Sequence, residues 1–183
     1  MSTIKVSTIS PLGTDATKTI TIGNAGDTIA GMGANTPAFF AQLSSDQSVS
    51  SATSTKAQIN QESFDTDNCY DNSTNYRFTP TVAGKYFVYG SIQANGNTNS
   101  ALAFIMSNIA KNGTNISQNL IDNRNNYGGL NTASYTSVIV DMNGTTDYLE
   151  LFGIHNVNSG TAGFDGSTAT ARTYFGAYRI IGA

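Results

Sequence analysis

The continuous segment from Phe64 to Tyr89 constrains the fold of this chain more than any other stretch. It opens with the Asp- and Asn-rich run FDTDNCYDNSTN, continues as YRFTPTVAGK and ends in the aromatic run YFVY. Asp and Asn side chains favour turns, because they bond to nearby backbone N–H groups. Consecutive aromatic residues favour a strand. The segment therefore predicts a tightly capped connection that leads directly into an aromatic β-strand.

That strand is expected to span Lys85 to Ile92 and to be apolar on both faces. Because side chains alternate along a strand, Tyr86 and Val88 lie on one side and Phe87 and Tyr89 on the other. A strand with two apolar faces has both of them covered. We expect one face to pack inside a β-sandwich and the other to pack against another subunit.

The composition favours an all-β fold. Only 11% of the residues are charged, against about 25% in an average soluble protein. The chain holds 24 Thr, 20 Asn, 19 Ser and 18 Gly, a bias typical of short strands joined by tight turns. No segment shows a sustained helical period.

Eight strands are expected between the turn-forming residues. They cover Ala38–Leu43, Thr55–Asn60, Tyr76–Thr79, Lys85–Ile92, Ala101–Lys111, Tyr135–Met142, Tyr148–Phe152 and Thr173–Ile181. The dipeptide Asn112-Gly113 is a strong signal for a two-residue hairpin turn, and a second turn is expected over residues 143–147. This spacing of strands and turns is typical of a sandwich.

The first 36 residues precede the eight expected strands and have a hairpin pattern of their own. They are expected to form an N-terminal arm on a head of residues 37–183. Thr17–Ile22 alternates, Gly23–Asp27 signals a turn, and Thr28-Ile29 begins a second short strand. A lone hairpin cannot bury its apolar face by itself. Two interpretations stay open: an anchoring arm, or a loosely packed leader. The candidate anchoring residues are Ile4, Val6, Ile20 and Ile22.

Nucleic acid and membranes are not expected as partners. The nine Lys and Arg residues are scattered and the net charge is −3, so no basic stripe is present to bind a phosphate backbone. The apolar run from Ala101 to Met106 is too short to span a bilayer, and the N-terminus does not read as an export signal.

No catalytic, metal or cofactor site is predicted. His155 is the single histidine and Cys69 the single cysteine, so a Cys/His metal cluster cannot be assembled within one chain. No nucleophile motif such as Gly-x-Ser-x-Gly accompanies His155, and no signature selects a catalytic pair among the two Glu and ten Asp. Cys69 is expected to be a small half-buried turn residue, with a reactive thiol or interchain bridge as the alternative.

The Asp-rich loop and three further loops are the places where a ligand could bind. Tyr70 and Tyr76 stand where an EF-hand needs Gly and Glu, which leaves either a looser calcium site or carboxylates that cap backbone N–H groups. Residues 95–100, 123–130 and 160–170 form the other loops. Their bulky side chains are candidate ligand contacts, with plain solvated loops as the alternative: Arg124, Tyr127 and Phe164.

The segment from Phe64 to Tyr89 resembles the signature of the complement C1q and tumour-necrosis-factor jelly-roll family. The shared pattern is an aromatic-Asp entry, a Tyr-Asp pair, an aromatic-x-Pro run and Ala-Gly-x-Tyr before an aromatic strand. The closing strand of residues 173–181 and the Lys-Asn-Gly turn also match. Asn75 and Cys69 stand where the family has glycine. The resemblance covers about four fifths of the chain.

This resemblance implies a C1q/TNF-like jelly-roll β-sandwich of about eight to ten strands, with a short N-terminal β-hairpin arm, that assembles as a homotrimer. It also implies a binding head rather than an enzyme. The subunit interface is then expected to involve Tyr86, Val88, Tyr174 and Tyr178, which come from two strands with apolar residues on both faces.

The whole chain resembles C1q-like virion proteins of tailed marine and cyanobacterial phages, in its MSTIKV opening and in its NSTNYRFTPTVAGKY segment. That resemblance implies a structural protein on the outside of a phage particle, assembled in the host cytoplasm. Its partners would be itself and a capsid or tail protein. The preferred hypothesis is a capsid cement or decoration protein. The alternatives are a tail-fibre or tail-spike head that binds host surface polysaccharide, and a free lectin-like module.

Overall fold

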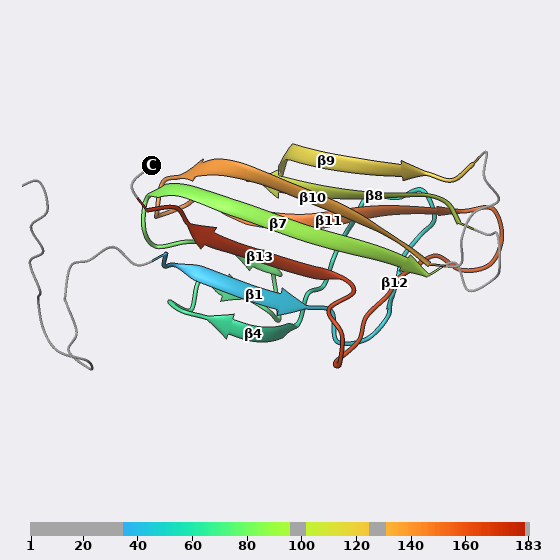
Figure 1. Ribbon diagram of the computed structural model, residues 1–183, viewed down its shortest axis with the longest axis horizontal. Helices are drawn as coiled ribbons and strands as arrows, with labels where there is room; N and C mark the ends of the chain where they lie inside the picture. The colour runs from blue at the N-terminus through green and yellow to red at the C-terminus, as the bar shows by residue number, and fades with distance from the viewer. Residues whose placement is uncertain (1–34, 96–101, 125–130, 182–183) are drawn as a thin grey trace, which may run out of the picture. The chain divides into compact units, whose positions relative to one another are not determined.

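Two antiparallel β-sheets pack face to face to form the head. The computed structural model describes residues 35–95, 102–124 and 131–181 (Figure 1). These residues belong to one compact unit that begins at Ala34. The predicted N-terminal arm lies outside the described residues, and the arm therefore stays a prediction.

The first sheet carries the strand that the sequence marks as apolar on both faces. Its strands run side by side in the order β4 (Gln61–Asp65), β1 (Ala38–Gln42), β13 (Tyr174–Arg179), β7 (Gly84–Asn95) and β10 (Asn131–Met142). Two short strands, β12 (Gly163–Phe164) and β2 (Gln47–Ser48), extend the sheet beside the end of β7.

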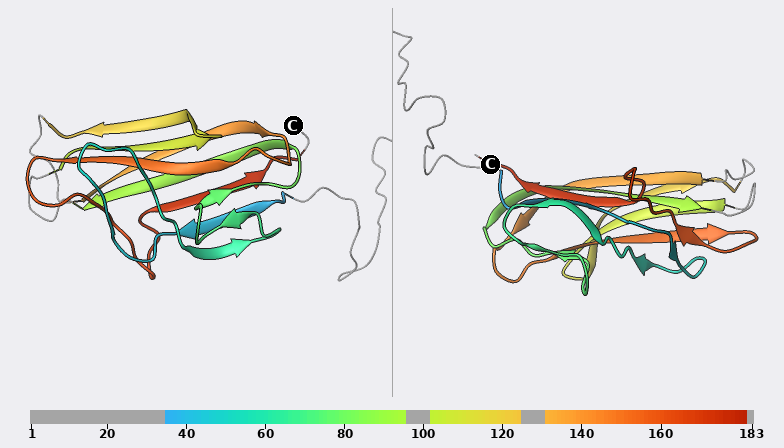
Figure 2. Two further views of the ribbon diagram at one scale, coloured as in Figure 1. Left: turned by 180° about the vertical axis from the view of Figure 1, so that it is seen from behind. Right: turned by 90° about the horizontal axis from the view of Figure 1, so that it is seen from below.

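The second sheet lies behind the first, as the reverse view in Figure 2 shows. Its order is β5 (Tyr70–Asp71), β6 (Arg77–Phe78), β11 (Leu149–Val157), β8 (Leu102–Lys111) and β9 (Thr114–Asp122), with β3 (Thr55–Lys56) paired to β11. β8 and β9 are joined by the predicted two-residue turn: Asn112 and Gly113 have φ angles of 52° and 79°, as a type I′ hairpin requires.

The predicted all-β sandwich is confirmed. The two-residue strands β2, β5 and β12 were not expected, and two longer strands, β4 and β9, were not expected either. β9 was not predicted, because its sequence TNISQNLID is mostly polar and has no aromatic residue to signal a strand. The segment 55–60 holds only the short β3, and β4 follows it at Gln61–Asp65. β4 was not predicted from the sequence, because three of its five side chains are exposed.

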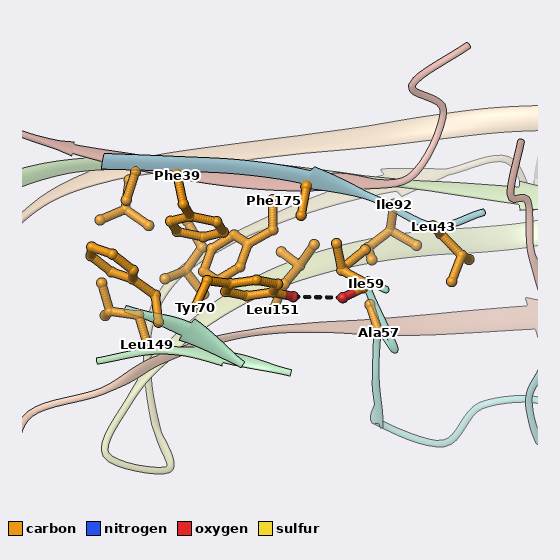
Figure 3. Close-up of a cluster of buried hydrophobic side chains, with 14 of the residues drawn as sticks. Phe39, Leu43, Ala57, Ile59, Tyr70, Ile92, Leu149, Leu151 and Phe175 are labelled. Carbon is orange, nitrogen blue, oxygen red and sulfur yellow. Dashed lines mark hydrogen bonds between the residues drawn. The ribbon is translucent and has the colours of Figure 1, made fainter. Parts of the chain in front are cut away.

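Phe39 stands at the centre of an aromatic cluster that joins the two sheets (Figure 3). Its ring stacks on Tyr70 at a centroid distance of 4.4 Å and on Phe78 at 4.7 Å, and Phe175 meets it edge-on at 5.2 Å. The Tyr70 hydroxyl donates to the Ile59 carbonyl at 2.9 Å, which satisfies a buried polar group. Burial raises the pKa of Tyr70.

The interior face of β7 is the one that carries Tyr86 and Val88, both fully buried. The Tyr86 hydroxyl donates to the Val82 carbonyl at 2.7 Å, and burial raises the pKa of Tyr86 to about 12. These two residues were expected at a subunit interface, and that expectation needs correcting. Their side chains belong to the core of a single protomer, so Phe87 and Tyr89 form the outer face.

A glycine in β11 makes room for a ring that the sequence had placed in a solvent loop. Phe164 was expected as a ligand contact, but its side chain is fully buried. A Cβ atom added to Gly153 would lie 2.6 Å from Phe164 Cζ and 3.0 Å from Ile92 Cγ2. Close packing of the sheets at this point therefore depends on the missing side chain of Gly153, and Phe164 is a core residue.

Replacing Gly153 by alanine is predicted to lower the free energy of unfolding by about 1 to 3 kcal/mol, because the added methyl overpacks a tight contact. Urea denaturation followed by far-UV circular dichroism measures this loss. Gly163→Ala is the matched control: its added Cβ would meet only the Gln47 carbonyl oxygen, at 3.5 Å. Equal losses in both variants would contradict the packing argument.

Candidate functional site

An aromatic face covers the outer side of the first sheet, away from the core. We use this name for Phe40, Phe87, Tyr89, Tyr135, Tyr174 and Tyr178. They come from four neighbouring strands, β1, β7, β10 and β13. Tyr135 and Tyr178 are 58% and 39% exposed, and the neighbouring Ile139 and Phe64 are 59% and 48% exposed. The sheet therefore presents a broad apolar surface to solvent.

The rings of the aromatic face contact one another across the strands. Tyr174 lies 5.6 Å from Phe40 and 6.3 Å from Tyr89, and Phe87 lies 5.5 Å from Tyr178, measured between ring centroids. These separations are within the range for favourable aromatic pairs. The rings support each other, so the face is preorganised as one surface.

Gly176 allows the Tyr89 ring to lie flat across β13. A Cβ atom at Gly176 would stand 2.5 Å from both Cζ and Oη of Tyr89. The strand pairing places these two residues directly opposite each other. A glycine in a central strand weakens the strand itself, and here the vacant space is filled by an aromatic ring from the neighbouring strand.

The aromatic face is electrically neutral at physiological pH. Burial raises the pKa of Tyr89, and burial together with neighbouring Tyr135 raises the pKa of Tyr174. A shallow hollow of about 350 Å³ opens between Phe87, Tyr89, Tyr135 and Tyr174. Such a surface can bind an apolar side chain, and it offers no charged group that could act as an acid, a base or an anion site.

A second candidate site, the polar hollow, lies where the Asp-rich loop meets β4. It has a volume of about 600 Å³. The polar groups that carry its chemistry are those of Glu62, Asn68, Asp71, Asn72, Asn75 and Arg77. The Asp-rich loop that contributes Asn68, Asp71, Asn72 and Asn75 was considered as a looser calcium site, whereas Glu62 and Arg77 were not predicted as binding residues because they lie on strands of different sheets.

The carboxylate of Asp71 holds the wall of the polar hollow in place. It accepts hydrogen bonds from the backbone N–H groups of Ser73, Thr74 and Asn75, at 2.9 to 3.1 Å, and from Asn75 Nδ2 at 2.7 Å. The bond from Thr74 contributes most to a pKa for Asp71 well below its usual range. This is the capping role anticipated as the alternative to a calcium site.

The left-handed backbone conformations of the loop differ from expectation. Asn75 was proposed to substitute for a glycine, but the positive φ angles are at Asn68 (52°) and Tyr76 (49°). Asn adopts this region readily, whereas a bulky residue such as Tyr rarely does. The Asn75 side chain instead bonds to Asp71, so its part in the loop is to hold the cap.

The remaining predicted contact residues fall into three groups. Tyr174 and Tyr178 lie on the aromatic face. Arg124 is exposed and paired with Asp122, and its hydrogen bonds lower the pKa of Asp122 to about 2. Five candidates lie outside the described residues, so their roles stay predictions: Tyr127, Ile4, Val6, Ile20 and Ile22.

His155 and Cys69 are both buried. His155 Nδ1 lies 3.0 Å from the backbone N of Gly163, and burial lowers the pKa of this histidine. Burial likewise raises the pKa of the Cys69 thiol, which favours the turn-residue interpretation over a reactive thiol. The described ranges contain no group of three metal-ligating side chains, and no helix long and apolar enough to cross a membrane is found in them.

Removing the Asp71 carboxylate is predicted to destabilise the head in a pH-dependent way. Because the pKa of Asp71 is lower in the folded state, its stabilisation is complete above pH ~4 and is lost as the pH falls further. Asp71→Ala should unfold about 2 kcal/mol more easily at pH 7, with a smaller difference at pH 2.5. Urea titrations at both pH values measure this, and a pH-independent difference would contradict the assignment.

Comparison with known proteins identifies the fold. No family model matches the sequence, and no curated protein matches it. Among solved structures, murine APRIL at pH 5.0 superposes with a TM-score of 0.55 at 9% identity, covering 78% of this chain and 98% of that one. The globular domain of zebrafish complement 1qA superposes with a TM-score of 0.53 at 10% identity, covering 79% and 97%. The described head therefore has the C1q/TNF jelly-roll fold.

Proposed function

We propose that this chain is a structural protein of a phage virion, a homotrimeric head displayed on the outside of the particle. In the preferred form it is a capsid cement or decoration protein anchored through residues 1–36. The function is binding and assembly rather than catalysis. The aromatic face is the single observation on which the proposed homotrimer rests.

The extent of the aromatic face argues for a protein partner. Contiguous exposed apolar patches are small on monomeric soluble proteins, and larger ones mark interaction sites. Here six aromatic side chains from four strands lie together, flanked by the exposed Ile139 and Phe64. Aromatic residues are also the type enriched at the centres of protein interfaces. Covering this face would remove most of its apolar surface from water.

A second apolar patch on the same protomer suggests that the partner is another copy. Ile116 and Leu120 are 37% and 47% exposed on β9, the edge strand of the other sheet. Two different patches that fit each other give a head-to-tail contact, which closes into a ring when the rotation allows it. We propose that β9 of one subunit packs on the aromatic face of the next, around a three-fold axis.

The virion assignment is supported by the sequence. Its opening hexapeptide and the segment from Asn72 to Tyr86 resemble phage virion proteins. The low charge, 11% of residues, suits close contact with a repetitive shell, since few ionic groups must lose their hydration. A trimer also matches the symmetry of three-fold and quasi-three-fold positions on an icosahedral capsid. These points favour decoration of the capsid.

A second candidate, the head of a tail fibre or tail spike, is favoured by the polar hollow. Such a hollow is a feature of a protein that binds a polar ligand. A cement protein does not require a hollow of this kind. In this form the aromatic face would still hold the trimer together, and the hollow would face the host surface.

Cryo-electron microscopy of purified particles separates the two forms. Trimeric density on three-fold or quasi-three-fold positions of the shell, with the arm running along the capsid, supports decoration. Density at the tail alone supports the fibre head. Particles that carry this chain at neither place would contradict the virion assignment altogether.

Placing a charge in the aromatic face is predicted to break the trimer without unfolding the protomer. Native protein should sediment at three times the chain mass of 19.2 kDa. Tyr178→Arg should weaken assembly about 100-fold, or about 3 kcal/mol, because an unpaired guanidinium would be buried in the contact. Sedimentation equilibrium over a concentration series measures the shift.

Ser54→Arg is the matched control, since Ser54 is an exposed residue of the loop before β3. It adds the same charge away from the aromatic face and should leave the trimer intact. Circular dichroism checks that both variants remain folded. A native chain that sediments as a monomer at micromolar concentration would contradict the proposal, as would a Tyr178→Arg variant that assembles normally.

A further inference from the structure

The polar hollow combines a rigid wall with polar groups that have no charged partner. Its wall is fixed by the four N–H hydrogen bonds to Asp71, by a fifth from the Ser73 hydroxyl, and by Lys56 Nζ, which donates to the Asn75 carbonyl at 3.1 Å. A site that is already ordered loses little conformational entropy when a ligand binds. The hollow is therefore built like a binding site rather than like a loose surface loop.

Arg77 is the first side chain of the hollow that is available to bind a ligand. Its guanidinium lies over the Tyr148 ring, 4.7 Å from the ring centroid, which fixes the plane of the side chain. The five ion pairs found among the described residues all join other side chains. A planar guanidinium held in this way presents several N–H donors in a fixed fork.

Glu62 is the second available group, and it accepts where Arg77 donates. Its carboxylate is likewise absent from those ion pairs, and partial desolvation, followed by the charge of Asp65, raises the pKa of Glu62. Asn68 and Asn72 add carboxamides that both donate and accept. The hollow thus places donors and acceptors around one space. Its volume of about 600 Å³ is typical of small-molecule sites.

The chemistry of the lining excludes several ligand classes. An apolar ligand would bury polar groups without replacing their hydrogen bonds with water. A polyanion would meet the two carboxylates of Glu62 and Asp71. A metal cation would find the Asp71 oxygens already committed to four N–H donors. A neutral ligand with many hydroxyl groups satisfies both the donors and the acceptors.

We propose that the polar hollow binds a neutral oligosaccharide. Arg77 donates to adjacent ring hydroxyl oxygens, Glu62 accepts from a hydroxyl, and the carboxamides of Asn68 and Asn72 complete the contacts. All of these residues belong to one protomer. The proposal therefore holds for a capsid or a tail location, and its outcome is independent of the trimer.

A glycan array that carries neutral and acidic bacterial oligosaccharides tests the proposal with the full-length chain. The native protein should bind neutral glycans, and isothermal titration should then give the affinity for the strongest one. Arg77→Lys keeps the charge but loses the planar fork, and Asn68→Gly keeps the left-handed backbone but loses the carboxamide. Each should weaken binding about tenfold, the effect of losing one or two hydrogen bonds.

Ser54→Ala is the control, because Ser54 is an exposed residue of the loop before β3 and is not among the residues that line the hollow. It should bind as the native chain does. Three results would overturn the proposal: no neutral glycan bound at millimolar concentration, preference for acidic glycans, or native affinity in both Arg77→Lys and Asn68→Gly. Because Asn68 is exposed, its variant keeps the test valid even if Arg77→Lys fails to fold.

Discussion

The packing of Phe39 against Tyr70, Phe78 and Phe175 is the contact on which the rest of the head depends. It joins β1 and β13 of one sheet to β5 and β6 of the other. Because side chains alternate along a strand, turning Phe39 and Phe175 inward turns Phe40 and Tyr174 outward. The packing of the core therefore determines which rings are presented to a partner, and a one-residue slip would exchange the two sets.

The order of strands and turns could be predicted because it follows local rules. Alternation placed β7 and β10, the aromatic-alanine start of the resembled family placed β1, and Asn112-Gly113 placed the turn that follows β8. The orientation of β7 could not be predicted, since both of its faces are aromatic or branched. Two features settle it. Val82, four residues before Tyr86, supplies a carbonyl acceptor for the buried Tyr86 hydroxyl, and Gly176, which lies on another strand, leaves space outside the sandwich for Tyr89.

The candidate sites likewise divide into parts that local rules predict and parts that depend on residues distant in the sequence. The capping role of the Asp-rich loop was anticipated from residue types alone, and Asp71 fulfils it with four N–H hydrogen bonds. The polar hollow needs Glu62 from β4 and Arg77 from β6, strands of different sheets, so no spacing in the sequence reveals it. Phe164 was misplaced for a related reason: its loop is rich in Gly and Thr, and the glycine that accommodates its ring, Gly153, lies on β11.

The proposed homotrimer requires that a second copy of the chain covers the aromatic face. Hydroxyl-radical footprinting of the full-length protein measures the solvent exposure of its tyrosine side chains directly. A free protomer exposes Tyr135 by 58% and Tyr178 by 39%, and both should then be oxidised readily. In the native assembly we predict strong protection of both tyrosines, which should be lost on dilution below the assembly range. Labelling of both tyrosines at the level of a free protomer, independent of concentration, would contradict the proposed homotrimer.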